Sequence, residues 1–495
     1  MARVDYFSSE ALSTGLRQKT VRGGAWTIGA QAASIIVALA AQPALARLLD
    51  QTDYGLLAMV AVFTNFGMLL VNAGLSMATV QRDEITHTQV TNLFWIATAL
   101  GVVIAALVAA SAPAIAFFYG EPELLGITLA LSLTFVLSGM TIQHQALLRR
   151  GMQFRELAAV QIVSVVLAQA VGIGWAWHYR GETNDYWALV WIPIVSSLTL
   201  MLGYWLVCHW RPGKPARGAG TLELVSFGAD VTGFNVVNYF ARNVDTLLIG
   251  WWYGAAPLGA YDRAYRLFLT PITQTIGPIS GVAIPALSRV VERPERYREA
   301  YLRILQPLML MLCPAVLFMM VYAEEVVVLV LGAKWIDAAP IFRALLIVGV
   351  VQPFTNAVSW IMFSHGRSRD VLRLGTLGAA IKVASFAIGL PWGPIGVALS
   401  YAIVGVFIHT PLAVWYVTRT GPISWKDLVR AFALPLAIGI VVAATALAAK
   451  WRIAYESSTI NLLIGLAICG VVWTFTVGNT KAGKYTIAEL RQTLR

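Results

Sequence analysis

Residues 92–117 read NLFWIATALGVVIAALVAASAPAIAF, a run of 26 residues without one charged side chain. An α-helix of about 20 residues is long enough to cross the hydrocarbon core of a bilayer. Similar runs recur along the chain, which is 58% apolar and only 12% charged, about half the charged fraction of a typical soluble protein. The sequence therefore predicts an all-α polytopic membrane protein.

We predict about 14 transmembrane helices from these runs. Short turns such as Gly120-Glu121-Pro122 and Pro391-Trp392-Gly393-Pro394 separate some of them. The expected bounds are 24–47, 54–76, 92–117, 124–146, 157–178, 187–208, 224–250, 258–286, 303–323, 339–362, 374–391, 394–418, 431–449 and 459–477.

Basic residues alternate from one loop to the next. Of the 36 Lys and Arg residues, 26 belong to the N-terminus, the even-numbered loops and the C-terminus, five to the odd-numbered loops and five to the spans. Basic loops stay in the cytoplasm, so we expect both termini to be cytoplasmic. The net charge of +11 then reflects a basic face toward anionic lipids, and no nucleic-acid partner is expected.

Several positions of the first half recur 204 residues later. An offset of six spans preserves orientation, so the halves are predicted to be parallel repeats that enclose a central cavity. The matched positions are Gly24-Ala25 with Gly228-Ala229, Gly29 with Gly233, Gly55 with Gly259, Gln31 with Asn235 and Ser34 with Asn238.

The repeat predicts two six-helix lobes followed by two extra helices. The expected organisation is a cytoplasmic N-terminal segment (1–23), an N-terminal lobe (24–210), a cytoplasmic inter-lobe loop (211–223), a C-terminal lobe (224–418), two further transmembrane helices (431–477) and a cytoplasmic tail (478–495).

A few cations lie inside or at the ends of the predicted spans, where a charge is costly unless it is paired or faces water. Arg binds a phosphate through two parallel hydrogen bonds, and Lys binds it as a point charge. These cations are therefore candidate ligands for an anionic group in the cavity. They are Arg47, Arg242, Arg263, Arg266, Arg343 and Lys382.

Structural explanations compete with binding for some of these cations. Arg242 is three residues from Asp245, and Arg266 is four residues from Asp262, so each pair can neutralise itself on a helix. Arg47 and Arg343 can extend to the headgroups. Lys382 has no acidic residue within a turn of its own sequence, so it is expected to face the cavity or a partner on another helix.

Uncharged and acidic residues inside the spans complete the candidate site. Four amide and hydroxyl side chains are expected to line the cavity, namely Gln31, Ser34, Asn235 and Asn238. Asp230 and Asp245 are candidates for coupling transport to H⁺ or Na⁺. Asp230 is equally suited to cap a helix N-terminus, so the coupling ion is left open.

Motifs for enzymatic chemistry are not found in the sequence. It contains no phosphate-binding GxxxxGK[ST] loop, no GxSxG elbow and no HExxH pair. The three cysteines, Cys208, Cys313 and Cys469, have neither metal-ligand nor disulfide-framework spacing. We therefore expect no catalytic residues, no metal site and no cofactor.

Several sequence blocks follow one another in order along the chain. They are Leu45-Ala-Arg47-Leu-Leu-Asp-Gln51-Thr-Asp53-Tyr54-Gly55, Gly74 to Gln89, Arg150-Gly-Met152-Gln-Phe154, Arg242-Asn-Val-Asp245, Leu258-Gly259-Ala-Tyr261-Asp-Arg263-Ala-Tyr265 and Ile284-Pro285-Ala-Leu-Ser288-Arg289. Together these blocks resemble Wzx-type polysaccharide flippases, in particular the colanic-acid-exporter branch of the multidrug/oligosaccharidyl-lipid/polysaccharide superfamily. Gln51 replaces the proline usual in the first block. The resemblance covers roughly residues 1–420.

The resemblance implies a flippase of the bacterial inner membrane that moves undecaprenyl-diphosphate-linked oligosaccharides to the periplasmic leaflet by alternating access. It implies membrane lipid and the lipid-linked glycan as partners, with a polysaccharide polymerase and glycosyltransferases beside them. The alternative is a cation-coupled multidrug exporter of the same superfamily, and a third is a scaffold for glycosyltransferases. The five bases against three acids inside the spans favour an anionic cargo.

Overall fold

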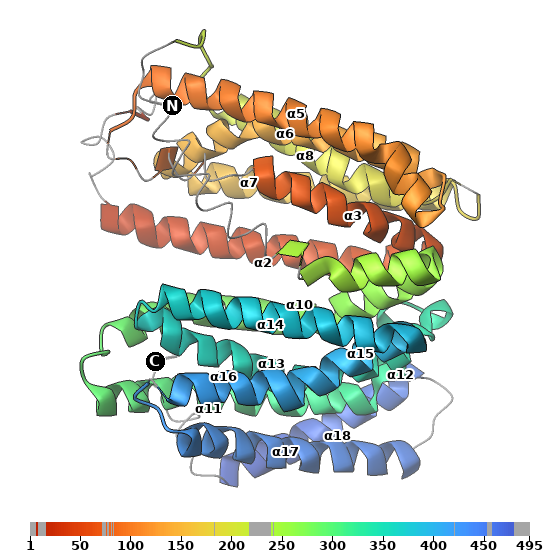
Figure 1. Ribbon diagram of the computed structural model, residues 1–495, viewed down its shortest axis with the longest axis vertical. Coiled ribbons are helices and arrows are strands. Elements are labelled where there is room, and N and C mark those ends of the chain that lie inside the picture. The colour runs from red at the N-terminus through yellow and green to blue at the C-terminus, as the bar shows by residue number, and fades with distance from the viewer. Residues whose placement is uncertain are drawn as a thin grey trace. The chain divides into compact units, whose positions relative to one another are not determined.

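The computed structural model describes residues 6–7, 16–71, 76, 79–80, 82, 84–182, 184–216, 239–240, 242–419, 421–452 and 458–479. Within these ranges all regular secondary structure is helical (Figure 1). The expectation of an all-α fold is therefore confirmed.

The chain divides into two compact units, residues 1–259 and 260–495. The helices of the first unit are α2 (Leu16–Leu48), α3 (Gln51–Val71), α5 (His87–Tyr119), α6 (Glu123–Arg150), α7 (Phe154–His178) and α8 (Trp187–Val207), followed by helical residues 242–253. α10 (Ala255–Ser288) begins in the first unit and continues into the second. The second unit also contains α11 (Pro294–Val321), α12 (Ala323–Val330), α13 (Ala338–Ser364), α14 (Ser368–Gly389), α15 (Gly393–Val404), α16 (Thr410–Thr418), α17 (Trp425–Arg452) and α18 (Ser458–Asn479).

Twelve segments of the described chain are long and apolar enough to cross a membrane. They cover thirteen of the predicted spans, because the segment Arg369–Thr418 includes the two expected at 374–391 and 394–418. The expected span 224–250 lies outside the described residues up to residue 238, and residues 242–253 are helical.

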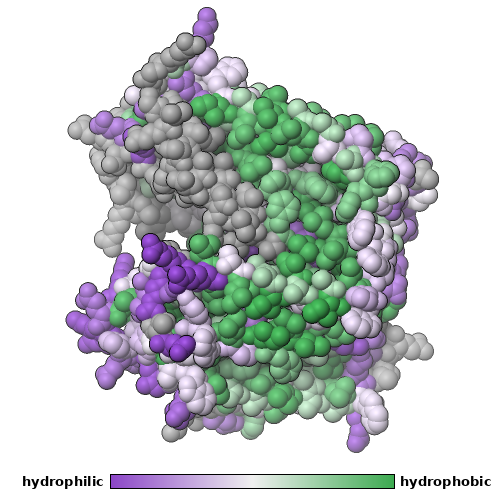
Figure 2. All heavy atoms as spheres, viewed as in Figure 1, coloured by the Kyte–Doolittle hydropathy of each residue, from purple (hydrophilic) through white to green (hydrophobic). Residues whose placement is uncertain are grey.

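The outer surfaces of these helices are apolar. Figure 2 shows hydrophobic side chains over the middle of the helices and hydrophilic ones gathered at helix ends. Large apolar side chains such as Phe117, Leu206 and Phe407 are exposed. Exposed apolar area of this extent is unusual for a soluble monomer and is what contact with lipid requires.

The capping of α5 shows how local sequence sets the ends of a span. Thr86 and Gln89 form a capping box, in which the Gln89 N–H donates to Thr86 Oγ1 (3.2 Å) and the Thr86 N–H donates to Gln89 Oε1 (2.9 Å). Gly120 ends the helix with a φ of 73°, a conformation that glycine adopts without strain. The predicted turn at Gly120 is confirmed.

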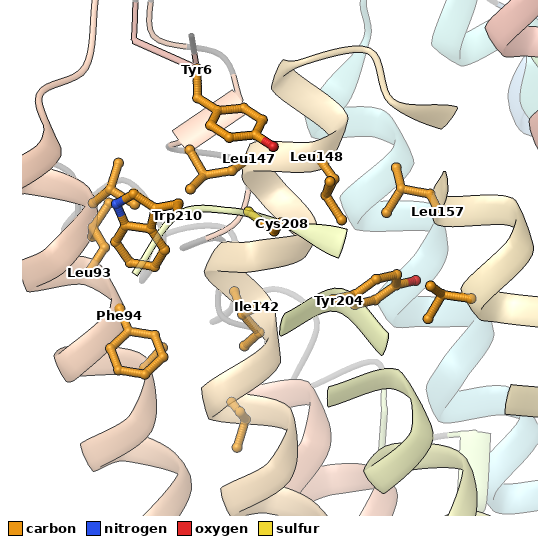
Figure 3. Close-up of a cluster of buried hydrophobic side chains, with 14 of the residues drawn as sticks. Tyr6, Leu93, Phe94, Ile142, Leu147, Leu148, Leu157, Tyr204, Cys208 and Trp210 are labelled. Atoms are coloured by element: carbon orange, nitrogen blue, oxygen red, sulfur yellow. The ribbon is translucent and has the colours of Figure 1, made fainter. Parts of the chain in front are cut away.

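An aromatic and aliphatic cluster joins the ends of α5, α6 and α8 in the first unit. Figure 3 shows Tyr6, Phe94, Cys208 and Trp210 grouped around the end of α6. His144 is fully buried there, and its ring stacks on Trp205 with a centroid separation of 4.4 Å. This histidine therefore has a packing role, as a lone histidine on a helix usually does.

The segment after α8 is tied to α5 by polar contacts at the same end of the unit. The Asn92 amide donates to the Ala216 carbonyl (2.7 Å) and accepts from the Ala216 N–H (3.0 Å), and Trp95 Nε1 donates to the Gly213 carbonyl (2.9 Å). Arg150 on α6 donates to the backbone carbonyls of Tyr6, Thr79 and Arg82. These bonds hold several loops on one end of the helices.

α17 and α18, which follow the repeat, pack on α11 in the second unit (Figure 1). Trp473 Nε1 donates to the Leu310 carbonyl (2.9 Å), and Arg298 forms an ion pair with Asp427 near the start of α17. At the other end of α17, Lys450 pairs with Glu325 at 2.7 Å. Both ends of this appended helix are therefore bonded to the helices before it.

The starts of α3 and α10 are in backbone contact. A Cβ built on Gly55 would lie 1.8 Å from the carbonyl oxygen of Ala255, and one built on Gly259 would lie 1.8 Å from the carbonyl oxygen of Gln51. All four residues lie in the first unit. The two contacts correspond to each other in the repeat, since Gln51 and Ala255, like Gly55 and Gly259, are 204 residues apart. The crossing is thus locally two-fold symmetric.

We predict that Gly55→Ala and Gly259→Ala each destabilise the protein, because the added methyl group would overlap backbone that cannot move aside. Overpacking of this kind costs about 1–3 kcal/mol or more. The matched controls are Gly29→Ala and Gly277→Ala, whose Cβ atoms would meet nothing within 4 Å. Thermal unfolding of the detergent-purified variants measures the effect, and equal melting temperatures for all four would contradict it.

A buried carboxyl pair lies beside this crossing in the first unit. Asp185, in the loop between α7 and α8, is 8% exposed, and its carboxyl group hydrogen-bonds that of Asp53 on α3. Burial raises the pKa of Asp185 above its usual value. A group with a raised folded-state pKa favours folding at low pH, and this contribution is lost as the pH rises.

We therefore predict that Asp185→Asn makes the protein less sensitive to alkaline pH. The variant should melt at a higher temperature than the original chain at pH 8, because the charge is gone, whereas the two should differ less at pH 5. Melting curves at both pH values test this. An Asp185→Asn effect of the same size at pH 5 and pH 8 would show that the charge of Asp185 is not its cause.

Candidate functional site

Lys382 on α14 lines a cavity of about 200 Å³ that lies wholly within the second unit. Its walls are α13, α14, α15 and α16, which are packed together (Figure 1). The lining residues are Val348, Gln352, Thr355, Asn356, Val358, Ser359, Met362, Val371, Leu374, Gly375, Ile381, Lys382, Tyr401, Val404, Gly405, His409, Thr410 and Ala413.

A polar stripe on α13 forms one wall of this cavity. Gln352, Thr355, Asn356 and Ser359 are spaced at i, i+3, i+4 and i+7, which places them on one face of a helix that is otherwise largely buried and apolar. Thr355 and Ser359 bond to backbone carbonyls of their own helix. Among the described residues, the side-chain amides of Gln352 and Asn356 have no protein hydrogen-bond partner.

A π-helical turn that packs against α13 forms another part of the cavity lining. Residues Gly405–His409 join α15 to α16, and the Thr410 hydroxyl donates to the Gly405 carbonyl at 2.8 Å. A Cβ on Gly378 would lie 2.8 Å from His409 Nε2, so the imidazole lies directly over α14, about one turn before Lys382. The extra residue in a π-helical turn changes the directions of the side chains around it, and such turns are frequent at functional sites.

The lining of the cavity contains basic side chains but no acidic ones. Lys382 and His409 are its titratable nitrogen groups, and none of the lining residues is Asp or Glu. A site of this composition is unsuited to a metal ion, which prefers carboxylate oxygens or several imidazoles. It is suited to an anionic or hydroxyl-rich group.

Arg263 and Arg266 share one carboxylate on α10. Asp262 lies 2.6 Å from Arg263 Nη2 and 2.9 Å from Arg266 Nε. Arg263 is only 7% exposed, whereas Arg266 is 55% exposed. The predicted pairing of Asp262 with Arg266 is confirmed, and the structure adds Arg263 to it. The three residues together keep one positive charge.

Arg343 on α13 also has an acidic partner in the second unit. Its guanidinium lies 3.0 Å from the Glu324 carboxylate on α12 and donates to the Met320 carbonyl at 3.3 Å. Both side chains are substantially exposed, so the pair contributes little to stability. Arg343 is thus neutralised near a helix end and is separate from the cavity around Lys382.

The first unit holds the other predicted site residues. Arg47 near the end of α2 and Arg242 are exposed, and Asp245 is buried with its carboxylate accepting from the Thr246 N–H at 2.9 Å. The helix that carries Arg242 and Asp245 packs on α3, where the Tyr239 hydroxyl donates to the Val62 carbonyl.

The polar residues predicted for the first span differ in exposure. Gln31 is exposed and Ser34 is buried on α2. Their counterparts in the repeat, Asn235 and Asn238, lie outside the described residues, as does Asp230. For these three the predicted roles stay predictions.

Sequence reasoning did not identify the α13 stripe. The signal was present, because Gln352, Thr355, Asn356 and Ser359 have helical spacing inside the predicted span 339–362. The uncharged candidates inside the spans were the ones that recur 204 residues apart, and none of these four residues belongs to the matched positions. The sequence therefore pointed to Lys382 but not to the α13 stripe that lines the same cavity.

The arrangement of helices defines a multi-pass transporter fold. A solved structure titled lipid II flippase MurJ, inward closed conformation, matches with a TM-score of 0.70 and covers 95% of this chain and 99% of that chain. The two sequences are 14% identical, so the likeness establishes the fold alone.

Residues 44–340, more than half of the chain, match the family described as polysaccharide biosynthesis protein. The chain belongs to this family, among the Wzx-type flippases of the superfamily to which the sequence blocks pointed. The lipopolysaccharide biosynthesis protein WzxC of Escherichia coli (strain K12) is 26% identical over 435 residues, which cover 86% of each chain. The teichuronic acid biosynthesis protein TuaB of Bacillus subtilis (strain 168) is 25% identical, covering 86% of this chain and 89% of its own.

We predict that Asp262→Asn is strongly destabilising, because it removes the carboxylate that pairs with the buried guanidinium of Arg263 at 2.6 Å. Removing one partner of a buried ion pair costs about 3–5 kcal/mol. Arg266→Gln should lower the stability far less, because Arg266 is exposed and the ion pair between Asp262 and Arg263 remains. The melting temperatures of the purified variants give the comparison, and a smaller loss for Asp262→Asn than for Arg266→Gln would overturn this assignment.

Proposed function

We propose that this protein moves undecaprenyl-diphosphate-linked oligosaccharide units from the cytoplasmic to the periplasmic leaflet of the bacterial inner membrane by alternating access. Membership of the polysaccharide biosynthesis family is the observation that carries the proposal. The multi-pass helical fold supports it, because such a cargo must cross the bilayer. Surface polysaccharide is the product that the transport would supply.

The chemistry of the cargo explains why a protein is needed. An isolated charged group transferred into hydrocarbon costs of the order of tens of kcal/mol, and every unpaired hydroxyl adds to this. A transporter replaces the lost water with cations and hydrogen-bonding groups. In the proposed mechanism the lipid tail stays in the bilayer while the diphosphate and sugars pass through the protein.

The charged side chains of the spans favour an anionic cargo. Asp262, Arg263 and Arg266 on α10 together have a net charge of +1. The residues that line the cavity around Lys382 include neither Asp nor Glu. Arg242, exposed on its helix, and Arg47 are the further cations that we assign to the diphosphate. The roles of Asp230 and Asp245 in ion coupling belong to the same proposal.

Two alternatives predict different behaviour. A cation-coupled multidrug exporter binds cations and would tolerate added negative charge in its cavity. A scaffold for glycosyltransferases would keep exporting polysaccharide when cavity residues are changed. A flippase should lose polysaccharide export when its cavity residues are changed, and above all when negative charge is added to the cavity. Substitutions of cavity cations therefore separate the three functions.

We predict that Arg242→Glu and Lys382→Glu each reduce surface polysaccharide at least about tenfold in cells that carry no other copy of the gene, because reversing a charge removes one ligand and repels the diphosphate. Lipid-linked repeat units should accumulate, as measured by mass spectrometry of extracted lipids. Ethidium efflux should not change.

The matched control is Arg303→Gln, which removes an exposed arginine paired with Glu299 on α11 and should leave export intact. Membrane levels of each variant are compared by immunoblot. Normal polysaccharide from well-expressed Arg242→Glu and Lys382→Glu proteins would contradict the proposal, and increased ethidium efflux would favour the drug exporter.

A further inference from the structure

The two ends of one apolar segment in the second unit are bonded to each other. The segment Arg369–Thr418 comprises nearly all of α14, then α15, the π-helical turn and α16. Near its end, the Tyr416 hydroxyl donates to the carboxylate of Asp370, near its beginning, at 2.8 Å. The start of α14 and the end of α16 therefore lie side by side, on the same face of the membrane that the segment crosses and crosses back.

Three exposed arginines lie at this junction of α14 and α16. Arg369 and Arg373 are exposed on successive turns of α14, about 6 Å apart along the helix axis, and Arg373 interacts with the Tyr416 hydroxyl. Arg419 directly follows α16 and is also exposed. Figure 2 shows hydrophilic side chains gathered at the end of the second unit where α14 begins. We call these three residues the junction arginines.

The junction has an excess of positive charge. Asp370 is the carboxylate bonded there, so three arginines and one aspartate give a net charge of +2. A guanidinium group binds a phosphate through two parallel hydrogen bonds, which makes arginine well suited to phosphate recognition. A ligand with two phosphate charges would balance this group of residues.

Exposed apolar side chains lie beside the junction arginines. The Arg419 guanidinium lies over the ring of Trp415, 4.6 Å from its centroid, and Trp415 is 52% exposed. Leu372, about one turn after Arg369 on α14, is 44% exposed. Tryptophan is enriched where a membrane meets water. The ligand that matches this surface therefore has hydrocarbon chains beside an anionic head, which is the chemistry of a lipid and differs from that of a free anion.

The charge pattern of the chain indicates which leaflet supplies the lipid. The basic loop before α14 is one of those predicted to be cytoplasmic, so the junction lies in the cytoplasmic leaflet. Anionic lipids of that leaflet attract basic residues near the membrane surface, and basic pockets between transmembrane helices on that side bind phosphate-rich headgroups. The position, the charge and the apolar neighbours of the junction thus favour the same class of ligand.

We propose that the junction arginines are a binding site for an anionic phospholipid with two phosphate groups, of the cardiolipin type. Its phosphates bind the guanidinium groups, and its acyl chains contact Trp415 and Leu372. None of the junction arginines is among the residues that line the cavity around Lys382. The bound lipid joins α14 to α16 at the ends of their segment, and its binding is independent of the cargo.

Native mass spectrometry of the full-length protein in detergent, titrated with cardiolipin, tests the site. Each of Arg369→Gln, Arg373→Gln and Arg419→Gln should weaken binding of the first cardiolipin about fivefold, because each basic residue near the surface contributes roughly that much to the attraction of an anionic headgroup. The matched control is Arg296→Gln, which removes an exposed arginine from the start of α11 and should leave this binding unchanged. Melting temperatures establish that each variant is folded.

Comparison with other lipids identifies the ligand class. Phosphatidylglycerol, with one phosphate, should bind at least about threefold more weakly than cardiolipin, and phosphatidylcholine, which has no net charge, should not compete with it. The triple Arg→Lys variant keeps the charge but loses the paired hydrogen bonds, so it should bind cardiolipin more weakly than the original chain and more tightly than the triple Arg→Gln variant.

Unchanged cardiolipin binding by the folded Arg→Gln variants would overturn the proposal, as would an equal loss in Arg296→Gln, which would show a general attraction to basic residues. Equal binding of cardiolipin and phosphatidylglycerol would reject the assignment of two phosphates. Displacement of cardiolipin by an equal concentration of undecaprenyl diphosphate would make a polyprenyl diphosphate the occupant and would also reject it. None of these measurements involves transport, so their outcome leaves the proposed flippase function untouched.

Discussion

The hydrocarbon core of a bilayer solvates neither charges nor free backbone groups, and this constraint governs the whole chain. It requires helices, because they satisfy their own backbone, and it requires every charge to find a partner or water. Asp262 accordingly forms ion pairs with both Arg263 and Arg266, and Glu324 forms one with Arg343. Lys382 lines a polar cavity whose lining residues include neither Asp nor Glu. A cargo with negative charges can meet such a group at far lower cost than it can meet lipid.

The repeat supplies the second constraint. Its two glycines, Gly55 and Gly259, stand where the starts of α3 and α10 touch backbone to backbone, and each contacts the residue that corresponds to the other's partner. A side chain at either position would separate the helices. The match between Gly55 and Gly259 is therefore also a packing requirement, and each of these glycines lies inside a sequence block that resembles the flippases.

Length and hydropathy were sufficient to predict thirteen of the fourteen spans, because lipid imposes both on any crossing helix, and the span 224–250 lies largely outside the described residues. The turns at Gly120 and Gly393 were also predictable, because glycine adopts a positive φ without strain and both residues have one. Partners distant in sequence were not predictable: Glu324 lies 19 residues from Arg343 on another helix. The π-helical turn at Gly405–His409 has no simple sequence signal. The α13 stripe has a helical spacing that is visible in the sequence, but none of its four residues belongs to the matched positions of the repeat that supplied the other uncharged candidates.

The most direct measurement is transport by the purified protein in liposomes. A fluorescent polyprenyl-diphosphate glycan is placed in both leaflets, and the fraction accessible to a membrane-impermeant quencher is followed with and without an ion gradient. We predict that the protein raises the accessible fraction from about half toward all of the label, and that Arg242→Glu and Lys382→Glu abolish the gain. No translocation by well-folded protein under any H⁺ or Na⁺ gradient would contradict it.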